Sequence, residues 1–311
     1  MYRLMLWAAA VIAWLPQAAS AEGAQPCMMR KLVSLDMQTF SDGEFAVPVA
    51  INDQLMNLTV DTGSIASSVS LDAAMQLNSR LTYTGSGGHF LNNIEVDYTT
   101  TVHSFALGSL RSSGDFTLLA IPNLLTTVIS PGLLGYDVLR NYDVEFDFYR
   151  GKFNLFVHNT CLGHAVYWTR EAFAAIPLKT DGSHHIVVRA YLDGKPVKVI
   201  FDTGSSSSVM SEDAAKSLFG WSDNDPRLKS AGSEKINGGE WVPVHTFPFG
   251  SLVFDGIAVT NPQITLIPQH NFRLDRYGDA SIVLGMSVLR QLHIYVAYDE
   301  GILYLTGAEA Q

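Results

Sequence analysis

The sequence is poor in basic residues and in long hydrophobic runs, and each shortage excludes a class of protein. Its 311 residues include 20 lysines and arginines against 30 aspartates and glutamates. Because no basic cluster offsets this balance, the chain repels nucleic acid and anionic membrane surfaces, and we expect no nucleic-acid partner. Beyond the N-terminal segment no apolar run is long enough to span a bilayer, so we expect no stable membrane insertion.

The N-terminal segment has the pattern of a secretory signal peptide. Arg3 provides a positive start, residues 4–15 are apolar, and Ala19-Ser20-Ala21 matches the small-residue cleavage pattern. We therefore expect removal of residues 1–21 by cleavage after Ala21, and a periplasmic or secreted protein. An uncleaved membrane anchor is the alternative.

Cysteine is also scarce, with Cys27 and Cys161 as the two present. In an exported protein these cysteines are expected to form a disulfide, and two buried or free thiols are the alternative. Two cysteines alone do not make a metal site, and His184 and His185 are adjacent to each other rather than at metal-ligand spacing. We therefore expect no metal site, and structural roles for the histidines.

Two common catalytic motifs are missing. No Gly-x-Ser-x-Gly elbow surrounds residues 205–208, which argues against a serine nucleophile. The glycine cluster at residues 85–88 lacks the helix and the lysine of a nucleotide-binding loop. The chemistry must therefore be sought in other residue types.

What the chain does contain is a long internal repeat. Residues 60–64, Val-Asp-Thr-Gly-Ser, return at residues 201–205 as Phe-Asp-Thr-Gly-Ser, an interval of 141 residues. The preceding residues 45–51 align without a gap with residues 186–192, and both are strand-like. Downstream, two similar short helices are expected after the candidate caps Ser70 and Ser211.

The repeat and the composition together predict the architecture. Glycine, tyrosine, phenylalanine, valine and threonine are plentiful while long helical periodicities are scarce, which favours an all-β fold. A repeat of over 120 residues indicates duplicated domains. We expect two homologous, closed-barrel-like β lobes related by a pseudo-twofold axis, at residues 22–157 and 180–311, joined by a connector at 158–179.

The repeated acid carries the candidate chemistry. A carboxylate at the end of a buried strand is costly unless it is hydrogen-bonded, and the neighbouring glycine amides and hydroxyls can supply such bonds. If the lobes pack about a twofold axis, Asp61 and Asp202 become neighbours. Two carboxylates roughly 3 Å apart share one proton, and such a pair can activate a water for attack on a carbonyl.

Asp61-Thr62-Gly63-Ser64 and Asp202-Thr203-Gly204-Ser205, with the later apolar-apolar-Gly segments at 133–135 and 283–285, resemble the retropepsin-like aspartic peptidases in a single-chain, two-lobe form. The resemblance implies the bilobal aspartic-peptidase fold and hydrolysis of peptide bonds by Asp61 and Asp202. It implies loop support from Thr62, Gly63, Ser64, Thr203, Gly204 and Ser205. It implies a peptide or protein substrate and no cofactor, and we expect a monomer because the duplication supplies both halves of the site.

The resemblance also implies hairpin flaps over the substrate, and each lobe has a glycine-rich segment in a suitable place. The flap candidates are Gly85, Gly87, Gly88, Gly232, Gly238 and Gly239. Their presence in both lobes favours two flaps, with plain surface loops as the alternative. At the level of the whole protein, the alternative to a peptidase is a catalytically silent peptide-binding or inhibitory protein on the same fold.

Overall fold

The computed structural model describes residues 29–89, 95–123, 130–158, 165–180, 184–222, 224–235, 241–268 and 281–309. The expected signal peptide, Cys27 and Cys161, and the flap candidates Gly238 and Gly239 lie outside the described residues. The cleavage and the disulfide therefore stay predictions. Within the described ranges, no helix has the length and apolar character needed to cross a membrane.

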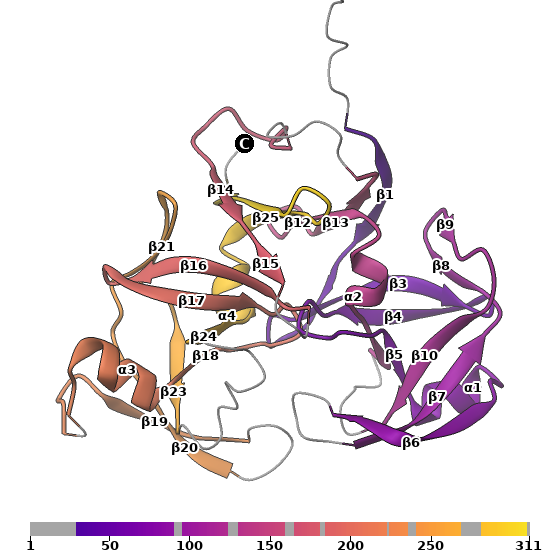
Figure 1. The fold of residues 1–311 in the computed structure, drawn as a ribbon, viewed down its shortest axis with the longest axis horizontal. Coiled ribbons are helices and arrows are strands. Elements are labelled where there is room, and N and C mark those ends of the chain that lie inside the picture. Colours follow the sequence, from indigo (N-terminus) through magenta and orange to yellow (C-terminus); the bar gives the residue numbers. More distant parts are fainter. Residues whose placement is uncertain are drawn as a thin grey trace, which may run out of the picture.

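Three sheets make up the described part of the chain, two of ten strands and one of six (Figure 1). The first ten-stranded sheet contains β2 (Gln38–Thr39), β3 (Phe45–Ile51), β4 (Gln54–Val60), β5 (Ser68–Ser70), β6 (Leu81–His89), β7 (Glu95–Val102), β8 (Phe105–Leu107), β9 (Leu110–Arg111), β10 (Phe116–Ile121) and β11 (Gly132–Leu134). The second contains β15 (Lys179–Thr180), β16 (Ile186–Leu192), β17 (Lys195–Phe201), β18 (Ser208–Ser211), β19 (Lys229–Lys235), β20 (Trp241–Thr246), β21 (Ser251–Phe254), β22 (Ile257–Thr260), β23 (Ile264–Ile267) and β24 (Ile282–Leu284).

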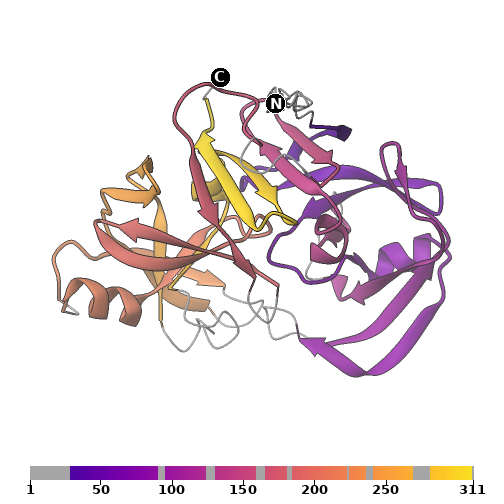
Figure 2. The same ribbon diagram turned by 45° about the horizontal axis from the view of Figure 1, so that its top comes forward.

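The two large sheets have the same topology. Their strand orders are β6-β7-β10-β5-β11-β4-β3-β8-β9 and β19-β20-β23-β18-β24-β17-β16-β21-β22, which correspond strand for strand. Each sheet curls around its own lobe, and the lobes lie side by side (Figure 2). The all-β, two-lobed fold predicted from the sequence is confirmed.

Local sequence explains the central hairpin of each lobe. The turn between β3 and β4 has Asn52 at φ 48° and Asp53 at φ 61°, and the turn between β16 and β17 has Asp193 at 45° and Gly194 at 76°. A two-residue hairpin loop of type I′ needs a positive φ at both central positions, and asparagine, aspartate and glycine adopt it most easily. These turns fix the register of the strands that lead to Asp61 and Asp202.

The described residues contain four short helices, and the two expected caps are present. The helices are α1 (Leu71–Gln76), α2 (Tyr136–Leu139), α3 (Glu212–Phe219) and α4 (Met286–Leu289). Ser70 Oγ accepts a hydrogen bond from the Ala73 amide at 3.1 Å, and Ser211 Oγ accepts one from the Ala214 amide at 3.2 Å. Both predicted caps are therefore confirmed.

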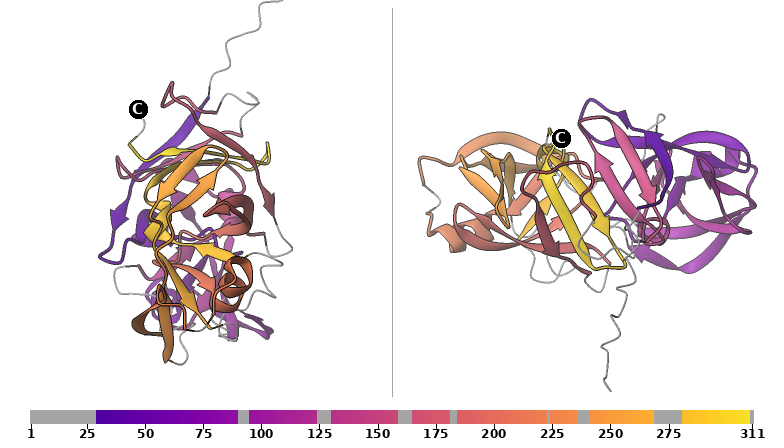
Figure 3. Two further views of the ribbon diagram at one scale, coloured as in Figure 1. Left: turned by 90° about the vertical axis from the view of Figure 1, so that its left-hand side faces the viewer. Right: turned by 90° about the horizontal axis from the view of Figure 1, so that it is seen from above.

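The six-stranded sheet joins the two lobes. It contains β1 (Lys31–Asp36), β12 (Asp143–Asp147), β13 (Lys152–Phe156), β14 (Ala174–Pro177), β25 (Leu292–Ala297) and β26 (Ile302–Gly307). Antiparallel pairing of β12 with β25 places Val144 opposite Val296. Seen from above, this sheet lies between the two lobes (Figure 3). The predicted connector contributes β14 to it, and one buried hydrophobic cluster includes Phe146 and Ile294 from the two halves.

Candidate active site

The two Asp-Thr-Gly-Ser loops begin where β4 and β17 end. Parallel pairing places Leu134 beside Val60 and Leu284 beside Phe201. The Asp61 amide donates to the Leu134 carbonyl at 3.0 Å, and the Asp202 amide donates to the Leu284 carbonyl at 2.9 Å. The apolar-apolar-Gly segments thus lie beside the loops and fix the backbone of each acid.

Two buried threonines bind the loops to each other across the lobe boundary. The amide of Thr62 donates to Thr203 Oγ1, and the amide of Thr203 donates to Thr62 Oγ1, both at 3.1 Å. Each hydroxyl in turn donates to a carbonyl of the other lobe, Thr62 to Phe201 and Thr203 to Val60, both at 2.7 Å. Because buried polar groups are costly to leave unpaired, this reciprocal set fixes the two loops in one arrangement.

The arrangement brings Asp61 and Asp202 together, each against the glycine of the opposite loop. A Cβ atom added to Gly204 would lie 2.3 Å from Asp61 Cγ, and one added to Gly63 would lie 2.6 Å from Asp202 Cγ. Only glycine leaves room for such an approach. The two carboxyl groups also hydrogen-bond to each other.

The environment of the two acids is unequal. Burial raises the pKa of Asp61, but the amides of Gly63 and Ser64 and the proton of Asp202 oppose the shift. Burial also raises the pKa of Asp202, and there the negative charge of Asp61 adds to the shift while the Gly204 amide opposes it. The Gly63 amide donates to Asp61 Oδ1 at 2.8 Å and the Gly204 amide to Asp202 Oδ1 at 3.0 Å. Asp61 therefore ionises first, and Asp202 holds the proton that the pair shares.

The hydroxyls of Ser64 and Ser205 were expected to hydrogen-bond the acids, but they donate to backbone carbonyls of their own loops instead. Ser64 Oγ donates to the Ala66 carbonyl and Ser205 Oγ to the Ser207 carbonyl, both at 2.9 Å. Each serine therefore closes its own turn, and its amide donates to the backbone carbonyl of the acid residue, Ser64 to Asp61 and Ser205 to Asp202, both at 3.3 Å.

The glycine-rich segments form one hairpin in each lobe. β6 pairs with β7 with a register shift between Tyr83 and Gly88, and β19 pairs with β20 with a shift between Ser230 and Ser233. Gly85 and Gly232, at φ 66° and 93°, lie within these irregular stretches, while Gly87 lies in β6. Both hairpins lie at the end of the molecule opposite the six-stranded sheet (Figure 1). The hairpin connections lie outside the described residues, so the flaps stay a prediction.

Two ionisable residues, Glu44 and His185, lie beside the loops, a position that was not predicted from the sequence. His185 is 5% exposed, and its Nε2 donates to the Gly63 carbonyl at 3.1 Å. Glu44 accepts a hydrogen bond from the Ser206 amide, and burial, followed by the charges of Asp42 and Asp61, raises the pKa of Glu44 to about 7. The repeat held the signal for both, because residues 44 and 185 are separated by the same 141 positions as the acids.

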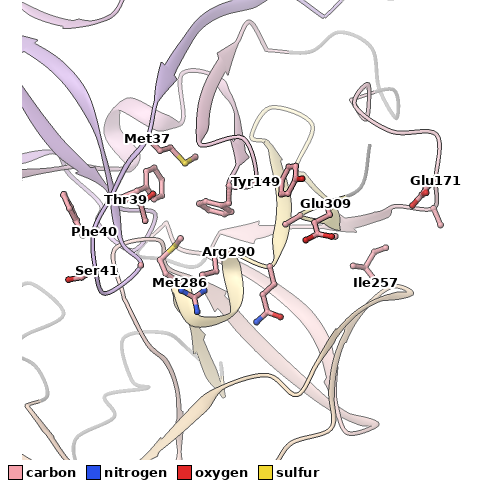
Figure 4. A pocket seen from close by; sticks show the side chains of 17 residues that line it. Met37, Thr39, Phe40, Ser41, Tyr149, Glu171, Ile257, Met286, Arg290 and Glu309 are labelled. Carbon is pink, nitrogen blue, oxygen red and sulfur yellow. The ribbon is translucent and has the colours of Figure 1, made fainter.

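A cavity of about 1000 Å³ lies near these loops without including either acid. Its wall is formed by the segment before β3, by α4 and by the end of the chain. Figure 4 shows Phe40 and Ser41 on one side, Met286 and Arg290 from the α4 region, and Tyr149 across from them. In the described ranges, no group of three or more histidine, cysteine, aspartate or glutamate side chains is placed to hold a metal ion.

Comparison with known proteins agrees with this reading. A family model described as aspartyl protease matches residues 188–288, which include Asp202-Thr203-Gly204. The curated proteins contain no match. Among solved structures, basic 7S globulin from soybean is similar with a TM-score of 0.51 and 10% sequence identity, covering 91% of this chain and 96% of that chain. At this identity the likeness concerns the fold alone. The chain thus has the bilobal aspartic-peptidase fold, and its resemblance to the aspartyl proteases is confirmed.

Proposed function

We propose that this protein is an aspartic endopeptidase that cleaves peptide bonds with a water activated between Asp61 and Asp202. The observation that carries the proposal is the contact between these two carboxyl groups, each packed against the glycine of the other lobe. A pair of acids that share one proton contains both a base and an acid at the same point. Hydrolysis of an amide needs both.

In the first step the ionised Asp61 takes a proton from the water. The water oxygen bonds to the carbonyl carbon of the substrate, and the carbonyl oxygen takes the proton of Asp202. The product is a neutral tetrahedral intermediate with two hydroxyl groups. The backbone amides of Gly63 and Ser64 favour the ionised form of Asp61 that begins this step.

In the second step the intermediate collapses. Asp61 gives its newly acquired proton to the leaving nitrogen as the carbon–nitrogen bond breaks. Asp202 takes a proton back from one hydroxyl group as the carboxylic acid product forms. Both acids return to their starting states, so the cycle needs no cofactor.

The test is hydrolysis of a denatured protein substrate from acid to neutral pH by the wild type and by Asp61→Asn and Asp202→Asn. Each substitution should lower kcat at least about a hundredfold, because general acid–base groups contribute at least that much. The double variant should lose little more than either single one, since the pair acts as a unit. Asp115→Asn, which changes an acid whose side chain is 63% exposed, is the control and should be fully active. Retention of activity in either dyad variant would exclude the mechanism.

The alternative is a protein that binds peptides on this fold without cleaving them. The similar soybean protein is named a globulin, and its name mentions no enzyme. Retention of both acids here favours hydrolysis. An inactive wild type that still binds members of a peptide library would support the alternative.

We further propose that the protein acts outside the cytoplasm as a monomer, without nucleic-acid or membrane partners. The support is the signal-peptide pattern of residues 1–21 and the acidic balance of the chain. A disulfide between Cys27 and Cys161 belongs to the same proposal. The intact mass of the mature protein, measured with and without thiol alkylation after purification, tests the cleavage after Ala21 and the disulfide.

A further inference from the structure

Glu44 and His185 occupy equivalent places in the two lobes. Each is the residue directly before the strand that leads into the central hairpin, Glu44 before β3 and His185 before β16. Equivalent positions in a symmetric pair of lobes would be expected to hold similar side chains. Here one lobe has a carboxyl group and the other has an imidazole.

Each of these side chains reaches the acidic loop of the opposite lobe. His185, from the second lobe, donates from Nε2 to the Gly63 carbonyl at 3.1 Å. Glu44, from the first lobe, accepts from the Ser206 amide. Both side chains therefore reach across the lobe boundary, so that each acidic loop is contacted by a titratable group from the other half of the chain.

The contact of His185 acts on Asp61 through one peptide group. The carbonyl of Gly63 and the amide of Ser64 belong to the same peptide unit, and that amide hydrogen-bonds to Asp61. A donor on the carbonyl polarises the unit and strengthens its amide as a donor. A positive charge on His185 also directly favours the ionised form of Asp61.

The contact of Glu44 acts on Asp202 in the opposite sense. A negative charge on Glu44 disfavours the ionised form of Asp202 and so keeps the proton on that residue. Reciprocally, the charge of Asp61 disfavours ionisation of Glu44.

Other charged groups lie close to Glu44. Asp42 adds to the negative charge on the same segment, and the Glu44 amide donates to Asp42 Oδ1 at 3.1 Å. From the α4 side, Arg290 Nη1 would lie 3.6 Å from a Cβ atom added to Gly43. On the other side of the pair, His185 follows His184, whose ring stacks on Tyr136 at 4.7 Å.

We propose that Glu44 and His185 are positioning residues that make the acid pair asymmetric, with His185 holding Asp61 ionised and Glu44 holding the shared proton on Asp202. This inference rests on the proposed function of the pair. It assigns the general base to the first lobe and the general acid to the second. It also predicts that Glu44 sets the position of the alkaline limb of the pH–rate profile and that His185 sets the position of the acidic limb.

The two limbs should respond separately to substitutions that keep the hydrogen bonds. Glu44→Gln keeps an acceptor for the Ser206 amide but removes the negative charge, so the alkaline limb of kcat/KM should move to lower pH by about half to one unit. His185→Gln keeps a donor for the Gly63 carbonyl but removes the positive charge, so the acidic limb should move to higher pH by a similar amount. Maximal kcat should stay within about threefold, because the acids themselves are unchanged.

The matched controls are Glu171→Gln and His184→Asn, which change an exposed glutamate and the neighbouring histidine without touching either acidic loop. Neither control should move a limb. The inference is overturned if Glu44→Gln leaves the alkaline limb in place or raises it, or if His185→Gln leaves the acidic limb in place or lowers it. A change in KM alone, with both limbs fixed, would also overturn it.

A titration that needs no turnover separates this inference from the proposed function. Side-chain carboxyl resonances of aspartate, labelled with ¹³C and assigned with the Asp61→Asn and Asp202→Asn variants, report each acid directly. Glu44→Gln should lower the pKa of Asp202, and His185→Gln should raise the pKa of Asp61. If these pKa shifts are found in a protein that cleaves no substrate, the inference holds and the peptidase proposal is wrong. If the enzyme is active but the pKa values of Asp61 and Asp202 are unchanged in the variants, the peptidase proposal holds and the inference is wrong.

A reciprocal measurement covers the case in which Glu44→Gln does not fold. Linkage requires that removing the charge of Asp61 lowers the pKa of Glu44, because that charge is one cause of its elevation. The ¹³C-labelled carboxyl group of Glu44 should therefore titrate at lower pH in Asp61→Asn than in the wild type. An unchanged titration of Glu44 would overturn the coupling.

Discussion

At the scale of single residues, Glu44 should affect the pH dependence of the free energy of unfolding as well as that of kcat/KM. Its pKa rises from 4.5 to about 7 on folding, so the folded state binds this proton more tightly than the unfolded state. The resulting stabilisation is complete below pH 4.5 and is lost as the pH rises to about 7. The loss is at most about 3.5 kcal/mol, since each unit of pKa shift corresponds to about 1.4 kcal/mol.

We therefore expect Glu44→Gln to flatten the dependence of the free energy of unfolding on pH between about 4.5 and 7. Urea denaturation at several pH values across this window measures it. Part of the slope should remain, because the raised pKa values of Asp61 and Asp202 act in the same direction. Glu171→Gln should keep the full slope. An identical slope in Glu44→Gln and the wild type would contradict the burial and charge environment assigned to Glu44.

The acids could be recognised from their own segments, whereas the positioning residues Glu44 and His185 are marked only by the 141-residue interval that separates them. Asp61 and Asp202 lie in a short motif whose neighbours, glycine and threonine, are needed by the same tight turn. Glu44 and His185 act across the lobe boundary, so nothing in their own segments marks them. From sequence His185 was expected to have a structural role, and its contact with the Gly63 carbonyl depends on how the lobes meet.

At the scale of elements, β12 departs from the alternation that its sequence suggests. Asp143, Glu145 and Asp147 fall on one face of the strand, a pattern typical of a solvated face. All three are buried, with exposures of 0%, 1% and 5%. The reason is that the segment around Tyr167 covers this face, and its hydroxyl donates to Glu145 Oε2 at 2.7 Å. That covering segment has no periodic pattern, so the sequence alone could not place it.

Glu145 is the centre of this buried polar group, and its substitution should lower the free energy of unfolding. Asn154 donates to it at 2.6 Å and His293 Nε2 lies 2.9 Å from it, with the Trp168 ring stacked on His293 at 4.2 Å. Glu145→Leu leaves these donors buried and unpaired, and should lower the free energy of unfolding by about 3 to 5 kcal/mol. Denaturant titration measures the loss, with Glu171→Leu as an exposed control. A loss below about 1 kcal/mol would show that the group is not the anchor of the sheet.

At the scale of the whole molecule, the repeat predicts two lobes but not what joins them. Each lobe has a local signal, namely paired hairpins and the repeated acidic turn. Within the six-stranded sheet, the hairpins β12–β13 and β25–β26 have turn signals at Gly151 and Gly301. The pairing of β12 with β25 has no such signal, because it brings together residues such as Phe146 and Ile294 from different repeats. The Thr62 and Thr203 bonds form a second junction of the same kind. Both junctions exist only when the two halves fold together.

Two junctions and a shared hydrophobic cluster predict one cooperative unfolding transition for both lobes. Scanning calorimetry should give a single peak whose calorimetric and van't Hoff enthalpies agree. The double variant Thr62→Val and Thr203→Val removes the cross-lobe hydroxyls, and because it leaves buried amides and carbonyls unpaired it should lower Tm by several degrees. The peak should nevertheless stay single, since the shared sheet still couples the lobes. Two resolved peaks in the wild type would mean that the lobes unfold independently. In that case Asp61 and Asp202, which come from different lobes, would separate whenever one lobe unfolds.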